Sequence, residues 1–209
     1  ALVQLSTGTP MQARLEHEWM QHHGANYLDG AILNGPPAIG TKHGHILVSG
    51  DRSAWEQSGS RLDCLGGTVR FEEGDAGTAS ALDLAWLSTW YGSFVSIAHA
   101  CRICAAENID VERFMQLLPD DIRVQYLAGT VRDEAFEKRS ATLSVWKKAL
   151  VSIQTQADEA RINGEFPDFV AGLLKRAERA GHGDENVMAL VKVMTLSLIH
   201  ISEPTRPIH

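Results

Sequence analysis

The stretch from Gly77 to about Glu107 most constrains what this chain can fold into. It contains no proline and almost no charge, and apolar residues occur on every side of a helical projection. This pattern predicts one long helix that other elements or a second subunit bury on nearly all sides. At 1.5 Å per residue the helix would span roughly 45 Å, which is more than one small domain needs.

A single carboxylate, Asp83, lies about two turns into this predicted helix, between Leu82 and Leu84. Because an isolated buried charge is costly, this carboxylate must be paired, solvated in a cleft or partly neutralised. Asp83 is therefore the first candidate for a catalytic residue. An Asp that faces a water-filled groove or bonds to a neighbouring backbone group would give the same pattern.

Residues 1–73 are predicted to form part of an α/β sheet domain. Strands are expected over residues 1–5, 27–33, 46–49 and 68–71. Thr9 is placed to cap a helix that begins at Pro10. An apolar stripe on that helix consists of Met11, Leu15 and Trp19. A capping box, residues 53–56, predicts where the next helix begins.

After an acidic hinge at residues 72–75 the pattern is helical to about residue 196. Asp110 is expected to cap one helix, and a loop is expected around Gly129. Further helices are expected over 140–163, 168–180 and 184–196, with Gly164 and Pro167 between the first two. Residues 197–209 have no helical period and are expected to be a non-native tail. The predicted domains are therefore 1–73 and 74–196.

Composition excludes several classes of function. Of the 209 residues 44% are hydrophobic and 22% are charged, and the net charge of -7 does not favour nucleic acid as a partner. Charged or polar residues interrupt the longest apolar runs, so no membrane span is expected. Three cysteines are too few for a disulfide framework, which favours a reducing cytoplasm. No metal site is expected, since the pair His43 and His45 has no acidic or cysteine cluster beside it.

Two groups of residues near the ends of predicted elements are candidates for binding. Ser6, Thr7 and Thr9 follow the carboxyl end of a strand, where open α/β sheets place ligands, although helix capping alone also explains Thr9. Trp90 and Tyr91 follow Asp83 by seven and eight residues on roughly the same helix face. They would either line an apolar substrate pocket or pack between subunits. The chain has no GxGxxG after a strand, so taken alone it cannot hold a dinucleotide pyrophosphate in the usual way.

Several ordered segments resemble the β-hydroxyacid dehydrogenase superfamily, and most closely its NADPH-dependent imine reductase branch. These segments are QLSTGTP, YLDGAI, IGT with ILVSG, GTASALDLAWL and AGHGDENVMALVKVM. The resemblance covers nearly all of residues 1–194. It implies the C-terminal part of a Rossmann-type domain, a long interdomain helix and a helical domain like the C-terminal domain of 6-phosphogluconate dehydrogenase. In that family about ninety residues with the Rossmann fingerprint precede the strand at Ala1, so the chain is expected to be a fragment.

The resemblance also implies a cofactor, a partner and roles for residues. The cofactor is NADPH, and Ser6, Thr7 and Thr9 would lie near its nicotinamide. Gly30 and Ala31 would lie near the substrate. Two chains would exchange their helical parts in a homodimer, with each active site between the Rossmann domain of one chain and the helices of the other.

One position distinguishes the branches of this superfamily. The hydroxyacid dehydrogenases carry a lysine early on the long helix, whereas this chain has no lysine between Lys42 and Lys138 and carries Asp83 instead. A carboxyl group can hydrogen-bond or protonate a basic nitrogen and can pair with an iminium cation, and an apolar environment would raise its pKa toward the range of a general acid. The resemblance therefore implies reduction of cyclic imines.

Two alternatives remain open from the sequence. One is a 3-hydroxyisobutyrate-type dehydrogenase with an altered catalytic position. The other is a helical dimerisation module without catalytic activity, in which case the fragment would bind no nucleotide.

Overall fold

The computed structural model describes residues 1–137 and 141–195, so the tail predicted at 197–209 lies outside the described residues. The chain divides into two compact units. Unit 1 contains residues 1–92 and 145–171, and unit 2 contains residues 93–144 and those from 172 onward. An α/β segment followed by helices confirms the predicted fold class. The predicted division between residues 73 and 74 stays a prediction.

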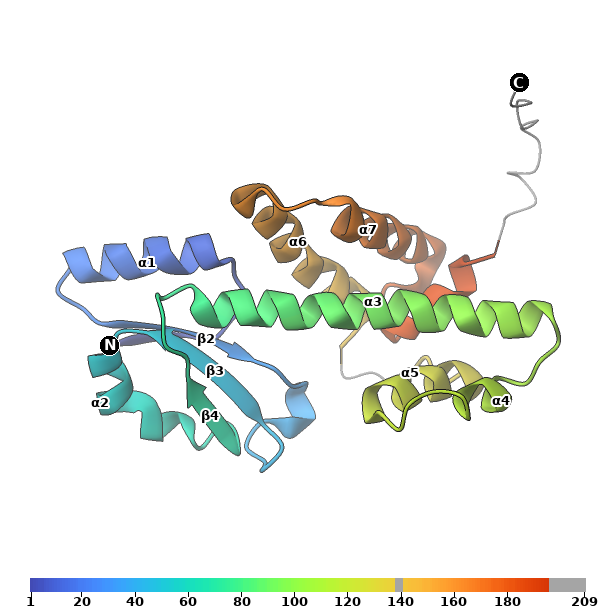
Figure 1. The fold of residues 1–209 in the computed structure, drawn as a ribbon, viewed down its shortest axis with the longest axis horizontal. Coiled ribbons are helices and arrows are strands. Elements are labelled where there is room, and N and C mark those ends of the chain that lie inside the picture. The colour runs from blue at the N-terminus through green and yellow to red at the C-terminus, as the bar shows by residue number, and fades with distance from the viewer. Residues whose placement is uncertain (138–140, 196–209) are drawn as a thin grey trace, which may run out of the picture. The chain divides into compact units, whose positions relative to one another are not determined.

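The N-terminal part of unit 1 is a four-stranded mixed sheet with flanking helices (Figure 1). Its elements are β1 (Leu2–Gln4), α1 (Pro10–His22), β2 (Tyr27–Ile32), a 3-10 turn (Pro36–Ala38), β3 (His45–Gly50), α2 (Arg52–Leu62) and β4 (Thr68–Phe71). The strand order is β1-β2-β3-β4, with β2 and β3 antiparallel and the outer pairs parallel. The four strands confirm the predicted strand positions.

The two faces of this sheet have different characters. One face carries Ile46 and Val48, which form an apolar core with Leu62 of α2. Because side chains alternate along a strand, Asp29 and Ser49, which are register partners, lie on the other face. That face receives the start of α3 (Thr78–Ala106), through hydrogen bonds described below. The polar residues of the sheet are thus gathered under the long helix.

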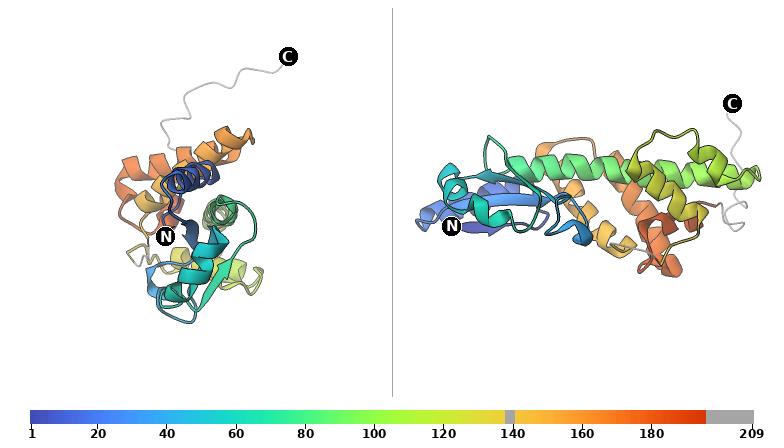
Figure 2. Two further views of the ribbon diagram at one scale, coloured as in Figure 1. Left: turned by 90° about the vertical axis from the view of Figure 1, so that its left-hand side faces the viewer. Right: turned by 90° about the horizontal axis from the view of Figure 1, so that it is seen from below.

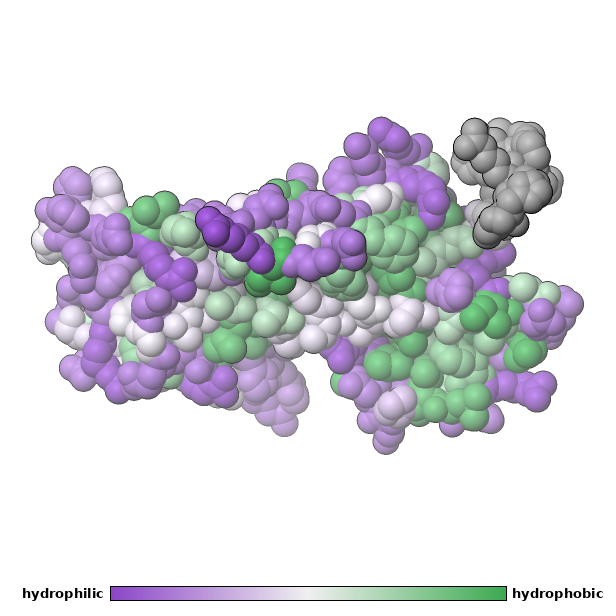
Figure 3. Space-filling view, turned by 45° about the horizontal axis from the view of Figure 1, so that its top comes forward, coloured by the Kyte–Doolittle hydropathy of each residue, from purple (hydrophilic) through white to green (hydrophobic). Residues whose placement is uncertain are grey.

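Helix α1 begins as predicted, with Pro10 in its first turn and the Thr9 side chain accepting a hydrogen bond from the Gln12 backbone N–H. Its apolar stripe, however, faces outward in this chain. Met11, Leu15 and Trp19 are 41%, 58% and 60% exposed, whereas Ala13 is buried. Apolar side chains likewise reach the surface among hydrophilic ones on the face drawn in Figure 3. The stripe is therefore not what holds α1 on the sheet.

The capping box predicted at residues 53–56 is wrong. Helix α2 begins at Arg52, with Asp51 as its N-cap residue, so Ser53 lies inside the helix. The Asp51 carboxylate makes no cap hydrogen bond. Instead it accepts a hydrogen bond from the Tyr27 backbone N–H at 2.8 Å and contacts the His17 Nε2 at 2.9 Å. The Asp51 carboxylate is therefore bonded to residues far away in the sequence and does not cap α2. A local sequence pattern cannot predict such contacts.

The long helix α3 confirms the prediction made for residues 77–107 and is uninterrupted in Figures 1 and 2. It passes from unit 1 into unit 2 after Gly92. The sequence also predicts that α3 is buried on nearly all sides. Within one chain it is not, because Leu82 and Ile103 of this helix are 40% and 54% exposed. Cover by a second subunit stays a prediction. No helix within residues 1–137 and 141–195 is both long and apolar enough to cross a membrane.

Unit 2 is helical, apart from an isolated bridge between Thr142 and Asn186. The elements after α3 are α4 (Val111–Met115), α5 (Ile122–Arg132), α6 (Leu143–Ala160), α7 (Glu165–Ala177), a π-helical turn (Glu178–His182) and a 3-10 helix (Val187–Val193). Of these, α6 and α7 are shared with unit 1. The predicted cap at Asp110 is confirmed, since its side chain accepts a hydrogen bond from the Glu112 backbone N–H at 2.9 Å.

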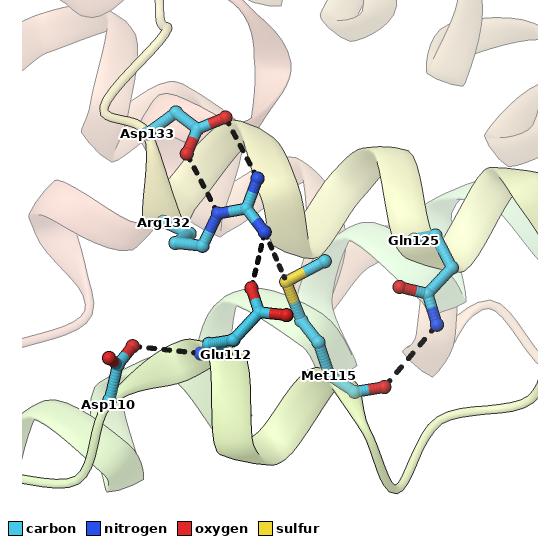
Figure 4. A network of polar contacts seen from close by, with 6 residues as sticks. All are labelled: Asp110, Glu112, Met115, Gln125, Arg132 and Asp133. Atoms are coloured by element: carbon cyan, nitrogen blue, oxygen red, sulfur yellow. Dashed lines mark hydrogen bonds and ion pairs between the residues drawn. The ribbon is translucent and has the colours of Figure 1, made fainter.

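The loop predicted around Gly129 is wrong. Gly129 lies inside α5, which Asp121 caps by accepting hydrogen bonds from two backbone N–H groups. At the end of α5 the Arg132 guanidinium donates to both oxygens of Asp133 and to Glu112 of α4 (Figure 4). These contacts and the cap extend the helix past a glycine, whose destabilising effect of about 1 kcal/mol they offset.

Two predicted helix boundaries near the C-terminal end also differ. Helix α7 begins at Glu165, and Pro167 occupies its first turn, where a missing backbone N–H is tolerated. The helix predicted over 184–196 is only a 3-10 helix, with the Asn186 side chain as its cap. The break predicted at residues 181–183 is confirmed, because Gly181 has a φ of 93°.

Candidate active site

The start of α3 is fixed to the sheet by side chains that cap its backbone. The Ser49 hydroxyl accepts a hydrogen bond from the Ala79 N–H at 2.9 Å and donates to the Ala76 carbonyl at 2.9 Å. The Asp29 carboxylate accepts one hydrogen bond from the Ser80 N–H at 3.2 Å and another from the Ser80 hydroxyl at 2.6 Å. These contacts satisfy backbone donors that a helix start leaves unpaired. The first turn of α3 is therefore held in place over the polar face of the sheet.

Asp83 lies one turn beyond Ser80 on α3 and is only 4% exposed. The Thr7 side chain, in the loop between β1 and α1, lies close enough to this carboxylate to lower its pKa. Burial raises the pKa of Asp83 to about 6, the Thr7 side chain lowers it, and the charge of Asp29 raises it. The carboxyl group can therefore exchange a proton near neutral pH, as a general acid must.

Asp29 is a second buried carboxylate that the sequence reasoning missed. It lies in the middle of β2 and is 2% exposed. Burial raises the pKa of Asp29 to about 6, against the lowering effect of its hydrogen bonds with Ser80. The sequence does contain a signal for Asp29, since an aspartate inside a strand of otherwise buried residues needs a partner. Assigning residues 27–33 to a strand does not by itself identify Asp29 as a candidate site residue.

Aromatic side chains follow Asp83 along α3. Tyr91 is fully buried and donates a hydrogen bond from its hydroxyl to the Trp146 carbonyl of α6 at 2.6 Å. The Tyr91 and Trp146 rings meet edge to face, with 5.7 Å between centroids. Trp90 lies 5.7 Å from Trp86 and 6.2 Å from Trp146 by the same measure. Trp86 and Trp146 were not predicted as part of this cluster.

The negative charge of Asp83 also affects the pKa of Tyr91. Burial raises the pKa of the Tyr91 phenol, and the Asp83 carboxylate raises it further. The phenol therefore stays protonated and acts as a hydrogen-bond donor near neutral pH.

A cavity of about 370 Å³ lies on a neighbouring face of α3 within unit 1. Its lining includes Leu84, Ala85 and Ser88 of α3, Ile153 of α6 and Phe166 of α7. Asp83, Trp90 and Tyr91 are not among its lining residues. The cavity is thus separate from the carboxyl group of Asp83.

The residues predicted to bind a cofactor lie together in the loop that follows β1. Ser6 and Thr7 are exposed, and both the backbone N–H and the hydroxyl of Ser6 donate to the Gln4 side chain, at 2.6 and 3.0 Å. Thr9 is buried and caps α1. The structure thus brings Thr7 of this group to Asp83, while Thr9 has a structural role.

Gly30 and Ala31 lie inside the sheet. A Cβ at Gly30 would come within 2.9 Å of the Leu47 carbonyl and of Val48, so only glycine fits there. Ala31 is buried. Their assignment to a substrate pocket stays a prediction. Nowhere in residues 1–137 and 141–195 do three or more His, Cys, Asp or Glu side chains gather closely enough to hold a metal ion.

Comparison with known proteins decides the family. The sequence model described as "NADPH-dependent reductive aminase-like, C-terminal domain" matches residues 75–195, which is more than half of the chain. The chain belongs to the NADPH-dependent reductive aminase-like family.

The relatives fit this family. The chain is 29% identical over 199 residues to an NADPH-dependent reductive aminase of Aspergillus oryzae (strain ATCC 42149 / RIB 40), over 91% of this chain and 68% of the aminase. The structure of an imine reductase from Myxococcus stipitatus in complex with NADP+ matches with 30% identity and a TM-score of 0.54, over 93% of this chain and 70% of that one.

A more distant likeness concerns the fold alone. The 3-hydroxyisobutyrate dehydrogenase of Mycobacterium tuberculosis has a TM-score of 0.81 but only 16% identity, over 93% of this chain and 70% of that chain. Membership of the family together with this fold confirms the resemblance on which the sequence-based prediction rests.

Proposed function

We propose that this protein belongs to an NADPH-dependent oxidoreductase that reduces the C=N bond of imines or iminium ions, cyclic ones among them, to amines. The observation that carries the proposal is the buried carboxyl group of Asp83, whose pKa burial raises and the nearby Thr7 side chain lowers. Named relatives that are a reductive aminase and an imine reductase support it. The missing lysine supports it over a hydroxyacid dehydrogenase.

The residues of the loop after β1 are compatible with the nicotinamide end of NADPH. Ser6 and Thr7 are exposed residues at the carboxyl end of a strand, where open α/β sheets place ligands, and their hydroxyl oxygens can accept hydrogen bonds. When bound, NADPH supplies the hydride that the imine carbon receives. Ser6 and Thr7 would hold and orient the carboxamide, and Thr9 would keep the loop in place by capping α1.

Asp83 would act on the nitrogen of the substrate. In its protonated form the carboxyl can donate its proton to an imine nitrogen, and in its ionised form it can pair with an iminium cation. A pKa of about 6 gives both forms near neutral pH. Trp90 and Tyr91 would bound the substrate on the side of α6, with Gly30 and Ala31 nearer the sheet.

We include in this proposal a homodimer formed through the helical domain, residues 74–196, with the α/β domain at residues 1–73. Exposed apolar side chains on α3 and α7 favour such a partner, since Leu82, Ile103 and Phe169 would be covered by it. An exchange of helical parts between two chains would place each active site between them. A cytoplasmic location completes the proposal.

The test uses this chain with the nucleotide-binding segment of a relative joined before Ala1. Oxidation of NADPH is followed with a cyclic imine, and reduction of NADP+ is followed with 3-hydroxyisobutyrate. The proposal predicts turnover of the imine and none of the hydroxyacid. The chain without the added segment is expected to be inactive.

Two results would contradict the proposal. Efficient oxidation of the hydroxyacid that survives Asp83→Ala would assign the protein to the 3-hydroxyisobutyrate-type dehydrogenases. Absence of both reactions, with NADPH bound to neither form of the chain, would favour a helical dimerisation module.

A further inference from the structure

We propose that the outer face of α1 and the open edge of β1 form a docking surface for a strand–helix unit that extends the sheet in parallel. This α1–β1 surface consists of Leu2 on β1 and of Met11, Leu15 and Trp19 on α1. The inference rests on the fold of unit 1 and on the family of the chain, and not on the reduction of imines.

The α1–β1 surface is apolar and largely uncovered. Met11, Leu15 and Trp19 recur at intervals of four residues, so they form one stripe along α1. Leu2 is 47% exposed, and the three residues of the stripe are 41% to 60% exposed. Contiguous exposed apolar surface of this kind marks a site of interaction.

A groove of about 380 Å³ lies between β1 and α1 on this surface. It is lined by Leu2, Leu15, Glu16, Trp19 and Met20. Glu16 is the one charged residue of this lining, and both of its carboxylate oxygens already accept hydrogen bonds. The donors are the Gln12 side-chain amide at 2.8 Å and the Tyr27 hydroxyl at 2.7 Å. The groove therefore suits an apolar side chain of an occupant.

The two edges of the sheet differ in their protection. On β4, Arg70 is ion-paired with Glu72, and the Arg52 guanidinium lies 4.8 Å from the ring centre of Phe71. Charged side chains on an edge strand oppose pairing with a further strand. In contrast, β1 (residues 2–4, LVQ) carries no charged side chain, and its outer side presents backbone N–H and C=O groups. The edge at β1 is therefore the one open to a further strand.

The topology gives the orientation of the occupant. The strands β1 and β2 are parallel and α1 connects them, which makes a βαβ unit. The Leu2 N–H donates to the Asn26 carbonyl at 2.9 Å, on the side of β2, so the Val3 N–H points to the open side. Connections between parallel strands are right-handed in about 98% of cases. A parallel strand beside β1 that is linked to it by a helix therefore has that helix on the face of the sheet that carries α1, against the apolar stripe.

The occupant with this chemistry is the nucleotide-binding segment of the family. The model of the C-terminal domain matches residues 75–195, and the part of this chain before that match is α/β. This chain spans 68% of the Aspergillus oryzae aminase and 70% of the Myxococcus stipitatus imine reductase, so close to a third of each protein lies outside the match. A second copy of this chain fits less well, because two β1 strands related by a two-fold axis would pair over only three residues.

The test joins the nucleotide-binding segment of the Aspergillus oryzae aminase before Ala1, through a linker that contains a protease site. After the linker is cut, the two pieces are expected to stay together in size-exclusion chromatography. Their Kd is then measured by dilution, with a dye on the added segment. Hydrogen exchange of the Val3 amide should be slower in the complex than in this chain alone, by at least about tenfold, because a paired edge strand protects it.

Variants of the stripe separate docking from the folding of this chain. Leu15→Gln and Trp19→Gln change exposed side chains, so each should leave the thermal unfolding midpoint of this chain alone within about 2 °C. In the complex each should raise the Kd at least about tenfold, because an apolar side chain is then lost from a buried contact. Ile122→Gln is the matched control, since Ile122 of α5 is 89% exposed and lies outside the α1–β1 surface. It should change the Kd by less than about twofold.

Several results would overturn the inference. These are separation of the cut pieces, an unchanged exchange rate at Val3, a Kd that Leu15→Gln and Trp19→Gln leave unchanged, and an equal effect of Ile122→Gln. Self-association of this chain alone that Leu15→Gln abolishes would also overturn it, because a second copy would then occupy the surface. Pieces that stay together without reducing an imine would contradict the proposed function alone.

Discussion

Asp29 of β2 and Ser49 of β3 are register partners across two antiparallel strands, and their side chains accept hydrogen bonds from the consecutive N–H groups of Ser80 and Ala79. A pair of neighbouring strands thus caps the long helix from outside it. This arrangement ties the polar face of the sheet to the turn of α3 that precedes Asp83. The position of the candidate catalytic carboxyl group therefore depends on the register of the sheet.

The first prediction concerns this cap. Ser49→Ala removes a buried hydroxyl that accepts from Ala79 and donates to Ala76, so the free energy of unfolding should fall by about 1 to 2 kcal/mol. Urea unfolding followed by circular dichroism measures this change. Ser53→Ala is the matched control, because Ser53 is exposed and does not cap α2, and it should change stability by less than about 0.5 kcal/mol. Equal losses would contradict the cap.

The second prediction concerns stability and pH. Because the folded-state pKa of Asp83 is raised from 3.8 to about 6, the native state binds the proton more tightly than the unfolded state does. The stability that this proton gives is complete below about pH 4 and is lost as the pH rises to about 6. Asp83→Asn, which stays neutral, should be more stable than the wild type by about 1 to 3 kcal/mol at pH 8 and no more stable at pH 4. Urea unfolding at both pH values measures this difference, and a gain that is the same at both would show that Asp83 is not titrating as described.

The third prediction uses two glycines of unit 2. Gly129 lies inside α5, and a Cβ there would meet Met115 no closer than 3.8 Å, so Gly129→Ala should stabilise by about 0.5 to 1 kcal/mol. Gly181 has a φ of 93°, which side chains rarely adopt, so Gly181→Ala should destabilise by about 1 kcal/mol or more. Thermal unfolding of the two variants gives the signs. Effects of the same sign would contradict the assignment of α5.

Local patterns predicted the elements because local interactions form them. The cap of α1 at Thr9, the strand at residues 68–71 and the long helix follow from neighbouring residues in the sequence. The cap of α2 did not, because the carboxylate of Asp51 has partners on α1 and β2 that lie far away in the chain. Gly129 was assigned to a loop on its own propensity, which the cap at Asp121 and the surrounding contacts outweigh.

The candidate site could be predicted only in part for the same reason. Asp83 stands out as a lone carboxylate in an apolar helix, and Thr7 follows a strand, so both have a signal in the sequence. That the two meet, and that Asp29 is held beside them by Ser80, depends on which face of the sheet receives α3. The sequence alone does not predict which face of the sheet α3 packs on. The roles of Gly30, Ala31, Trp90 and Tyr91 stay predictions.

The measurement that tests the central claim most directly is the rate of hydride transfer from NADPH to a cyclic imine in Asp83→Asn, in single turnover, with the nucleotide-binding segment of a relative joined before Ala1. Asp63→Asn, which removes an exposed carboxylate at the end of α2, is the control. If Asp83 donates the proton or pairs with the cation, its variant should be slower by about 10² to 10⁴ while the control keeps the wild-type rate. Equal rates in Asp83→Asn and Asp63→Asn would contradict a role for Asp83 in the reaction.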